Sequence, residues 1–206
     1  MRRWKPDDNS RLRAALVKAK AANMPKDNQT KAIKKGTGEG GDTNYTEKSY
    51  EGYGPGGVAV FVECLTDNIN RTVSEVRHAF TKSGGNLGTD GSVDWMFDRA
   101  GMLVYAKEKI SDYDSFFESA IENNAEDVKE DESNYEVRCA PADLMALKSA
   151  LDKFCEDPEF CELTRIPKNF TEVDDGKMQS LEKLINNLED SDDVQNVFHN
   201  AEITSS

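Results

Sequence analysis

The chain has 206 residues and a mass of 23.0 kDa, enough for one large domain or about two or three small ones. Its net charge of −13, hydrophobic fraction of 37% and mean hydropathy of −0.72 exclude a membrane-spanning segment and wholesale disorder. Four cysteines are too few for a disulfide framework, and the negative charge argues on its face against nucleic acid as a partner.

The charge is divided unevenly along the chain. Residues 1–41 hold eleven Lys or Arg and four Asp or Glu, a balance of +7. Residues 42–206 hold 15 basic and 35 acidic side chains, a balance of −20. This asymmetry indicates a basic element attached to an acidic body. Ordinary helices with solvated lysines are the alternative interpretation, and charge alone does not separate the two.

Two helices are predicted in the basic segment. Asn9 or Ser10 caps the first, over 11–24, and Pro25 ends it or opens the second. The second helix runs to about Lys35 and stops at Gly36, and a Gly-rich linker follows to residue 42. The side chains of this segment that we expect to contact phosphates are Arg11, Arg13, Lys18, Lys20, Lys26, Lys31, Lys34 and Lys35.

The first part of the body predicts a strand, a helix and two further strands. The apolar run 57–65 is typical of a central strand covered on both faces. Thr72 and Glu75 have the spacing of a capping box, and the helix they open ends at Gly84. Alternating Val93, Trp95 and Phe97 predict a half-buried strand. A turn over 99–101 and a strand over 102–106 follow.

The second part begins with a helix capped by Asp112. Its inward residues are expected to be Phe116, Phe117, Ala120 and Ile121. Residues 125–130 and 135–139 predict a hairpin around a turn over 131–134. An amphipathic helix over 144–154, a strand over 162–166, a helix over 178–188 and a strand over 194–199 complete the chain.

Alternating helices and strands with hairpins favour an α+β fold, in which one layer of helices covers a mostly antiparallel sheet. We expect a basic helical domain over 1–41 and two α/β sandwiches of the ferredoxin-like type. One is discontinuous, over 42–109 and 170–206, because the final helix and strand complete its sheet. The other is inserted, over 110–169.

No residue pattern indicates catalysis or a cofactor. The Gly-rich run 52–57 precedes a strand, so a turn is expected there and not a nucleotide loop. Cys155 and Cys161 lack the spacing of a zinc site, and buried or half-buried free thiols are expected instead. For neither His78 nor His199 does the sequence indicate a nucleophile that would form a catalytic site with it. The acidic runs 130–132 and 190–193 are interpreted as solvated turns and helix ends.

Several long motifs resemble the YebC/PmpR family. They are the runs at 21–28 (Ala-Ala-Asn-Met-Pro-Lys-Asp-Asn), 32–36, 50–59 (Tyr-Glu-Gly-Tyr-Gly-Pro-Gly-Gly-Val-Ala), 64–80, 84–97, 166–169 and 193–201. Together they span roughly Asn9 to Ile203, and long motifs in a fixed order are far more specific than one short pattern. The resemblance implies a helical N-terminal domain and two α/β domains, one of them discontinuous.

The resemblance also implies a regulator of gene expression and not an enzyme. Family members are regarded as DNA-binding regulators of transcription or as translation factors at the ribosome, some of which relieve stalling at proline-rich stretches. They usually begin with a Gly-His-Ser-Lys-Trp motif and some thirty further residues rich in Lys and Arg, whereas this chain begins Met1-Arg-Arg-Trp-Lys-Pro6. Without that segment we expect weaker binding of nucleic acid and partly uncovered Leu12, Leu16 and Ile33.

Between the two roles, we expect RNA at the ribosome, because a body of charge −20 is repelled by bulk duplex DNA. Promoter DNA is the alternative, and an acidic adaptor between proteins is a third hypothesis. Additional contacts are expected from Arg71, Arg77, His78 and Lys168, unless these only cap helices or pack. We expect a cytoplasmic monomer (mitochondrial in a eukaryote) with no secretion signal, membrane contact, small-molecule substrate, metal or cofactor.

Overall fold

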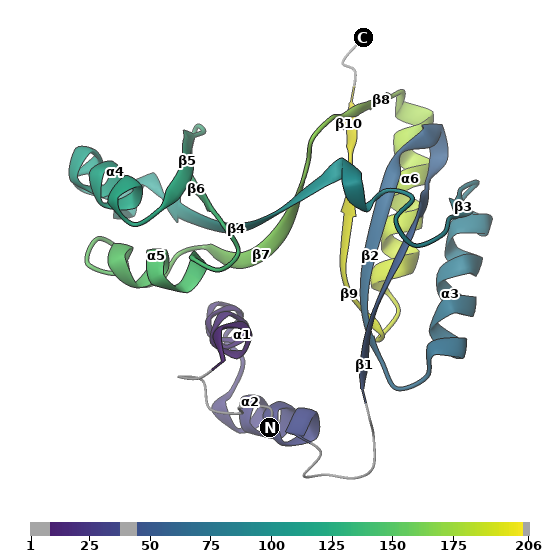
Figure 1. Cartoon of the computed structure of the whole chain (residues 1–206), viewed down its shortest axis with the longest axis horizontal. Helices are drawn as coiled ribbons and strands as arrows, with labels where there is room; N and C mark the ends of the chain where they lie inside the picture. The colour runs from purple at the N-terminus through teal and green to yellow at the C-terminus, as the bar shows by residue number, and fades with distance from the viewer. Residues whose placement is uncertain (1–8, 38–44, 204–206) are drawn as a thin grey trace. The chain divides into compact units, whose positions relative to one another are not determined.

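The computed structural model describes residues 9–37 and 45–203. The chain is a mixed α+β protein, with a helical region at its N-terminal end and antiparallel sheets covered by helices (Figure 1). The first helices are α1 (Ser10–Ala21) and α2 (Lys26–Thr37). The predicted linker over 36–42 lies outside the described residues, apart from its first two.

The first sheet has the strand order β3-β1-β2-β9, and every pairing in it is antiparallel. The strands are β1 (Thr46–Tyr53), β2 (Ala59–Thr66), β3 (Asn86–Leu87) and β9 (Val194–His199). Helices α3 (Ile69–Lys82) and α6 (Asp175–Glu189) cover one face, as Figure 1 shows. A short parallel pair, β8 (Thr171–Val173) and β10 (Ala201–Ile203), lies beyond the sheet.

Both faces of β2 are buried, as its apolar run predicts. Val60 and Val62 point into the core formed with α3 and α6, and both side chains are fully buried. Ala59 and Phe61 point to the opposite face, where they contact Val93. Burial on both faces explains why this strand lacks the alternation of a half-exposed one.

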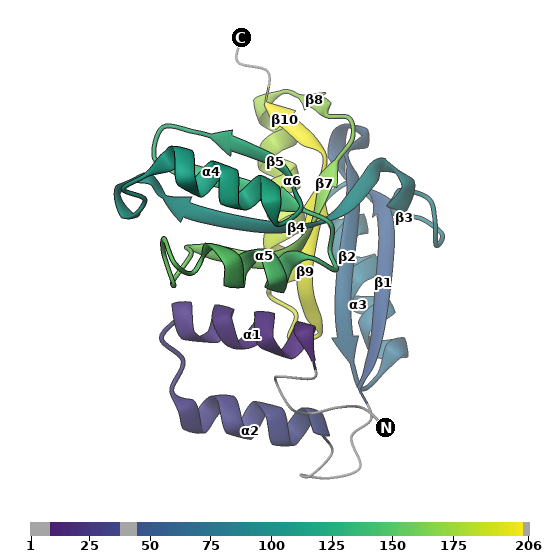
Figure 2. The same ribbon diagram turned by 60° about the vertical axis from the view of Figure 1, so that its left-hand side comes forward.

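The second sheet has the order β5-β6-β4-β7. Its strands are β4 (Phe97–Ala106), β5 (Ala125–Glu130), β6 (Asn134–Cys139) and β7 (Phe160–Pro167). Helices α4 (Tyr113–Glu122) and α5 (Leu144–Leu151) pack on it, and Figure 2 shows both. Tyr105 and Phe116 meet edge to face at 5.3 Å between ring centroids in this core.

Several predicted elements differ from the structure. The strand β1 was missed because its sequence mixes charged residues with Gly52 and lacks an apolar period. Residues 94–96 form a 3-10 turn instead of the predicted strand, and β4 continues through the predicted turn at 99–101. In α4, Phe117 and Ile121 were expected to face inward but are 38% and 47% exposed.

The strand β4 also pairs differently from the prediction. It was assigned to the discontinuous domain, whereas its second part pairs with β6, from Gly101 opposite Cys139 to Ala106 opposite Asn134. By packing, the chain divides into two compact units. One contains Asp42–Asp98 with Arg165–Ser206, and the other contains Met1–Gly41 with Arg99–Thr164. The three-domain division with borders at 41, 109 and 169 stays a prediction.

Among the helices of the described ranges, none combines the length and the apolar character that crossing a membrane requires.

Candidate nucleic-acid interface

The basic element is a pair of helices, α1 and α2, that lie side by side (Figure 2). The Asn9 side-chain oxygen accepts a hydrogen bond from the Leu12 backbone N–H at 3.0 Å, which confirms Asn9 as the predicted cap. At the start of α2, the Gln29 side-chain amide donates to the Met24 carbonyl at 2.7 Å. Local polar groups therefore hold both the first turn and the connection.

The first helix ends earlier than the sequence predicts, at Ala21 instead of Met24. Asn23 has a φ of 55°, in the left-handed region that Asn tolerates better than most residues. The Asn23 and Met24 amides then donate back to the Lys20 and Ala19 carbonyls at 2.9 and 2.8 Å. This reversal satisfies the last carbonyls of the helix and sets the direction of the next one.

The second helix presents three lysines of the predicted contact set to solvent, namely Lys26, Lys31 and Lys34. With about 100° between successive residues, Lys31 and Lys34 point away from Ile33, whereas Lys26, seven residues before Ile33, lies on nearly the same side as it. Within the described ranges, neither Lys26 nor Lys31 forms an ion pair. Their ammonium groups are thus available to an anion from outside the chain.

The other members of the predicted set are placed differently. Lys20 Nζ lies 2.8 Å from Asp157 Oδ1, and this hydrogen bond and charge raise the pKa of Lys20. Arg13 is half-buried and has interactions of its own. Three side chains of the set lie outside the part of the chain that the structure describes, those of Arg11, Lys18 and Lys35.

An apolar groove of about 330 Å³ lies between α1 and α2. Leu12, Leu16 and Ile33 line it and are only half-buried, as the sequence predicts. Within α2, the groove side and the side that carries Lys31 and Lys34 are therefore opposite faces of one amphipathic helix.

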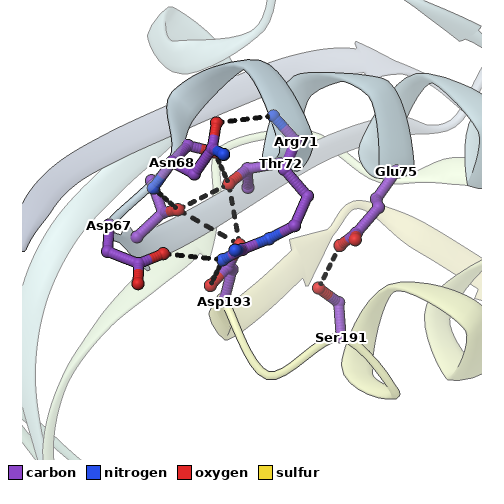
Figure 3. A network of polar contacts seen from close by, with 8 residues as sticks. Asp67, Asn68, Arg71, Thr72, Glu75, Ser191 and Asp193 are labelled. Carbon is purple, nitrogen blue, oxygen red and sulfur yellow. Dashed lines mark hydrogen bonds and ion pairs between the residues drawn. The ribbon is translucent and has the colours of Figure 1, made fainter.

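Arg71 lies in a network of polar contacts at the start of α3 (Figure 3). Its Nη2 donates to both Asp193 carboxylate oxygens at 2.9 and 2.8 Å and to Asp67 Oδ1 at 2.9 Å. The Thr72 and Thr66 hydroxyls donate to Asp193 at 2.8 and 3.1 Å. Burial alone raises the pKa of Asp193, but the hydrogen bonds from Arg71, Thr72 and Thr66 outweigh it, so the pKa is lowered.

This network corrects two predictions. Asp193 was interpreted as part of a solvated acidic run, whereas it is 6% exposed and binds the loop before β9 to α3. Thr72 was expected to open a capping box, but it is fully buried inside the helix. The actual cap is Asn68, whose side chain accepts from the Arg71 N–H at 3.1 Å.

A surface pocket of about 550 Å³ adjoins the network. The predicted contacts Arg71 and His78 line it, whereas Arg77 is exposed on the same helix outside the lining set. The charged residues of the lining carry both signs; they are Arg71, Glu75, Lys82, Asp190, Asp192 and Asp193. A pocket of mixed charge does not provide the one-signed field that concentrates phosphate.

The last predicted contact, Lys168, is hydrogen-bonded to the backbone of Trp95, whose exposure the sequence did not reveal. Lys168 Nζ donates to the Trp95 carbonyl at 3.0 Å and lies 3.3 Å from Asp98. Trp95 was expected in a half-buried strand, but its side chain is 62% exposed. The available signal was Asp94 next to it, since an acidic residue there is compatible with a turn and interrupts the strand pattern.

The thiols fit the expected structural role. Cys64, Cys139 and Cys161 are buried, Cys155 is half-buried, and all four are free. Burial raises the pKa of Cys64 to about 12 and the pKa values of Cys139 and Cys161 to about 11, so these thiols stay protonated at neutral pH. Within the described ranges, no group of three or more His, Cys, Asp or Glu side chains is arranged to hold a metal ion.

Comparison with known proteins settles the family. Residues 45–201 match the second and third domain of the TACO1/YebC family, and residues 1–39 match the N-terminal domain of TACO1/YebC proteins. The chain belongs to the TACO1/YebC family.

Relatives in this family are similar over nearly the whole chain. A probable transcriptional regulatory protein of Geobacter sulfurreducens is 51% identical over 97% of this chain and 80% of its own length. One from Persephonella marina is also 51% identical, over 97% and 80%. The crystal structure of a conserved hypothetical protein from Aquifex aeolicus matches with a TM-score of 0.85 and 43% identity, over 98% of this chain and 84% of that one.

The TACO1/YebC relatives are probable regulators of transcription and not enzymes. The family thus implies regulation linked to nucleic acid. This agrees with the expectation from the sequence that the chain regulates gene expression without catalysis.

Proposed function

We propose that this chain is a regulator of gene expression that binds RNA at the ribosome and eases the synthesis of difficult, proline-rich stretches. In this proposal, the exposed lysines of α2 contact phosphates and the acidic body faces basic protein. The link to difficult stretches is supported only by the sequence resemblance. We also propose the remaining predicted residues of the segment as phosphate contacts, namely Arg11, Arg13, Lys18, Lys20 and Lys35.

One observation carries the proposal: many cations of the body are paired with carboxylates, whereas two exposed lysines of α2 have no ion-pair partner within the described ranges. Matched pairs of the body are Lys48–Asp90, Lys107–Glu130, Lys148–Asp152, Arg71–Asp193 and Arg165–Asp94. Lys26 and Lys31 have no such partner within the described ranges. Phosphate binding of this kind positions a nucleic acid without reading its sequence.

Regulation of transcription through promoter DNA is the second candidate. The observation in its favour is that the relatives are called probable transcriptional regulatory proteins. The negative body argues against it, since 35 acidic residues over 42–206 repel a long duplex. A ribosomal site instead offers a local phosphate surface together with basic proteins.

Co-sedimentation with ribosomes and mobility shift on promoter DNA, each over a salt series, test the proposal. We expect the chain to sediment with ribosomes. Lys31→Glu combined with Lys34→Glu should weaken this association about tenfold and reduce its dependence on salt. The matched control is Lys129→Glu with Lys183→Glu, which makes the same change in net charge at exposed positions of the body.

The outcomes separate the candidates. Salt-resistant, site-selective binding of DNA without ribosome association would overturn the ribosomal proposal in favour of transcription. Equal weakening by the α2 and control variants would show that only net charge matters. Unchanged binding in the α2 variant would favour an acidic adaptor between proteins, which needs no phosphate contact.

We also propose that the α/β parts are ferredoxin-like sandwiches and that the chain acts as a monomer. The first proposal is supported by two four-stranded sheets, each packed against two helices. Sedimentation equilibrium of the full chain tests the second, and a mass near twice 23.0 kDa would contradict it.

A further inference from the structure

Trp95 and Tyr53 form an exposed aromatic pair around one backbone carbonyl. Trp95 Nε1 and the Tyr53 hydroxyl each donate to the Ser92 carbonyl oxygen at 3.1 Å. The polar atoms of both side chains are therefore satisfied within the chain. Much of the ring surface remains in solvent, because the side chains are 62% and 38% exposed.

A buried carboxylate fixes the loop that carries Trp95. Glu51 is 5% exposed and accepts hydrogen bonds from three backbone amides, those of Gly91, Val93 and Asp94, at 2.7, 2.7 and 2.8 Å. Val93 itself is fully buried. The backbone immediately before the indole is thus held by hydrogen bonds and by packing.

The backbone after the indole is fixed as well. The Lys168 amide donates to the Met96 carbonyl at 2.9 Å, and Lys168 Nζ donates to the Trp95 carbonyl at 3.0 Å. Phe97, next along the chain, is 4% exposed. Because the backbone on both sides of Trp95 is fixed, a small rearrangement of the loop cannot bury the indole. Rigid aromatic groups of this kind bind partners with little loss of conformational entropy.

The charge around the pair fits a nucleotide. Asp90, Asp94 and Asp98 lie near the loop, and each is matched by a cation, respectively Lys48 at 3.2 Å, Arg165 at 2.6 Å and Lys168 at 3.3 Å. Each of these three carboxylates is therefore paired with a cation, which reduces its repulsion of a phosphate. The Lys168 ammonium is held by the Trp95 backbone carbonyl, and from this position it is the cation that we expect to contact a phosphate of a stacked nucleotide.

We infer that Trp95 and Tyr53, with Lys168 bonded to the Trp95 carbonyl, form a stacking platform for unpaired bases of RNA. The inference rests on the proposed RNA-binding function. It adds a stacking contact to the bases, whereas the α2 lysines contact only phosphates. Aromatic side chains stack on any base, so the platform selects single-stranded RNA without strong sequence preference.

Two oligomers and one fluorophore test the platform. The full chain has two tryptophans, so Trp4→Phe leaves Trp95 as its sole indole. The Trp4→Phe variant is titrated with a 12-residue oligouridylate and with an abasic ribose-phosphate oligomer of equal length. We expect only the oligouridylate to quench Trp95 fluorescence. Trp95→Ala should weaken its binding about tenfold, as measured by anisotropy of labelled RNA, and leave the abasic oligomer unaffected.

Matched variants separate the platform from the phosphate contacts. Phe117→Ala removes an aromatic ring of similar exposure to Tyr53 and should leave binding of both oligomers unchanged. Lys31→Glu with Lys34→Glu should weaken both oligomers equally, because it affects phosphate contacts. Quenching is measured on the unmodified indole, so the test does not depend on the folding of Trp95→Ala.

Three results would overturn the inference. Binding of oligouridylate without quenching and without loss in Trp95→Ala would remove the platform but leave the proposed RNA binding intact. No binding of either oligomer would overturn both proposals. Quenching by a proline-rich peptide and not by oligouridylate would assign the aromatic pair to a polypeptide partner instead.

Discussion

Arg71 on α3 and Lys31 on α2 are both cations on exposed helices, but the fold uses them in different ways. Arg71 is held by Asp67, four residues before it, and by Asp193, far away in the sequence. Lys31 has no ion-pair partner within the described ranges. The function of a surface cation therefore depends on whether folding brings a carboxylate to it.

The largest change in the free energy of unfolding is expected in the polar network around Arg71. Asp193→Ala removes a buried acceptor of Arg71, Thr66 and Thr72, and we expect it to lower the free energy of unfolding by about 3 kcal/mol. Urea unfolding followed by Trp95 fluorescence, in a Trp4→Phe background, measures it. Asp192→Ala is the control, since this exposed neighbour should cost less than about 0.5 kcal/mol.

The second prediction concerns acid. The pKa of Asp193 is lower in the folded chain than its usual value near 3.9. Its carboxylate therefore contributes stability that is fully present above about pH 4 and is lost as the pH falls through the lowered folded value. We expect the stability of Asp193→Asn to depend less on pH than that of the unmodified chain below about pH 4. Parallel pH profiles in urea unfolding would contradict this assignment.

A smaller effect is expected at the cap of the same helix. Asn68→Ala removes the acceptor of the Arg71 backbone N–H and should cost about 1 kcal/mol of unfolding free energy. Asn70→Ala, two residues into the same helix and exposed, should be neutral or slightly stabilising, because Ala favours helix. Equal losses in the two variants would argue against Asn68 as the cap.

The smallest effect is expected on α2 and sharpens the comparison most directly. Lys26→Gln with Lys31→Gln removes two charges that have no ion-pair partner within the described ranges. We expect the free energy of unfolding to change by less than about 0.5 kcal/mol. Circular dichroism during thermal unfolding checks this. A loss comparable with that of Asp193→Ala would show that these lysines hold the fold together.

Elements with a clear apolar period were predictable from the sequence. The hairpin β5–β6 and the helices α5 and α6 lie where alternation or helical spacing places them. The strand β1 was not predictable in this way, since it is polar and is defined by its antiparallel pairing with β2, from Thr46 opposite Thr66 to Tyr53 opposite Ala59. Pairing with a neighbour, not local propensity, makes it a strand.

The candidate site likewise has one part that was predictable from the sequence and one part that was not. The lysines of α2 could be named from the sequence, because a cluster of like charge on one helix is a local property. The exposure of Trp95 could not, since it depends on Glu51, about 40 residues earlier, holding the loop by three amides. Nor could the burial of Asp193, whose partners Thr66 and Arg71 lie more than 120 residues before it.

The sequence by itself determined the family, the mixed α+β class, the basic character of the first segment and most helices and strands, because composition, periodicity and long motifs are properties of the chain. Which charges remain available and which aromatic side chains, such as Trp95, are exposed follows from the tertiary structure. Charge pairing and burial depend on groups that are distant in sequence: the Asp193 carboxylate meets Arg71 because β9, which begins at the next residue, pairs with β2.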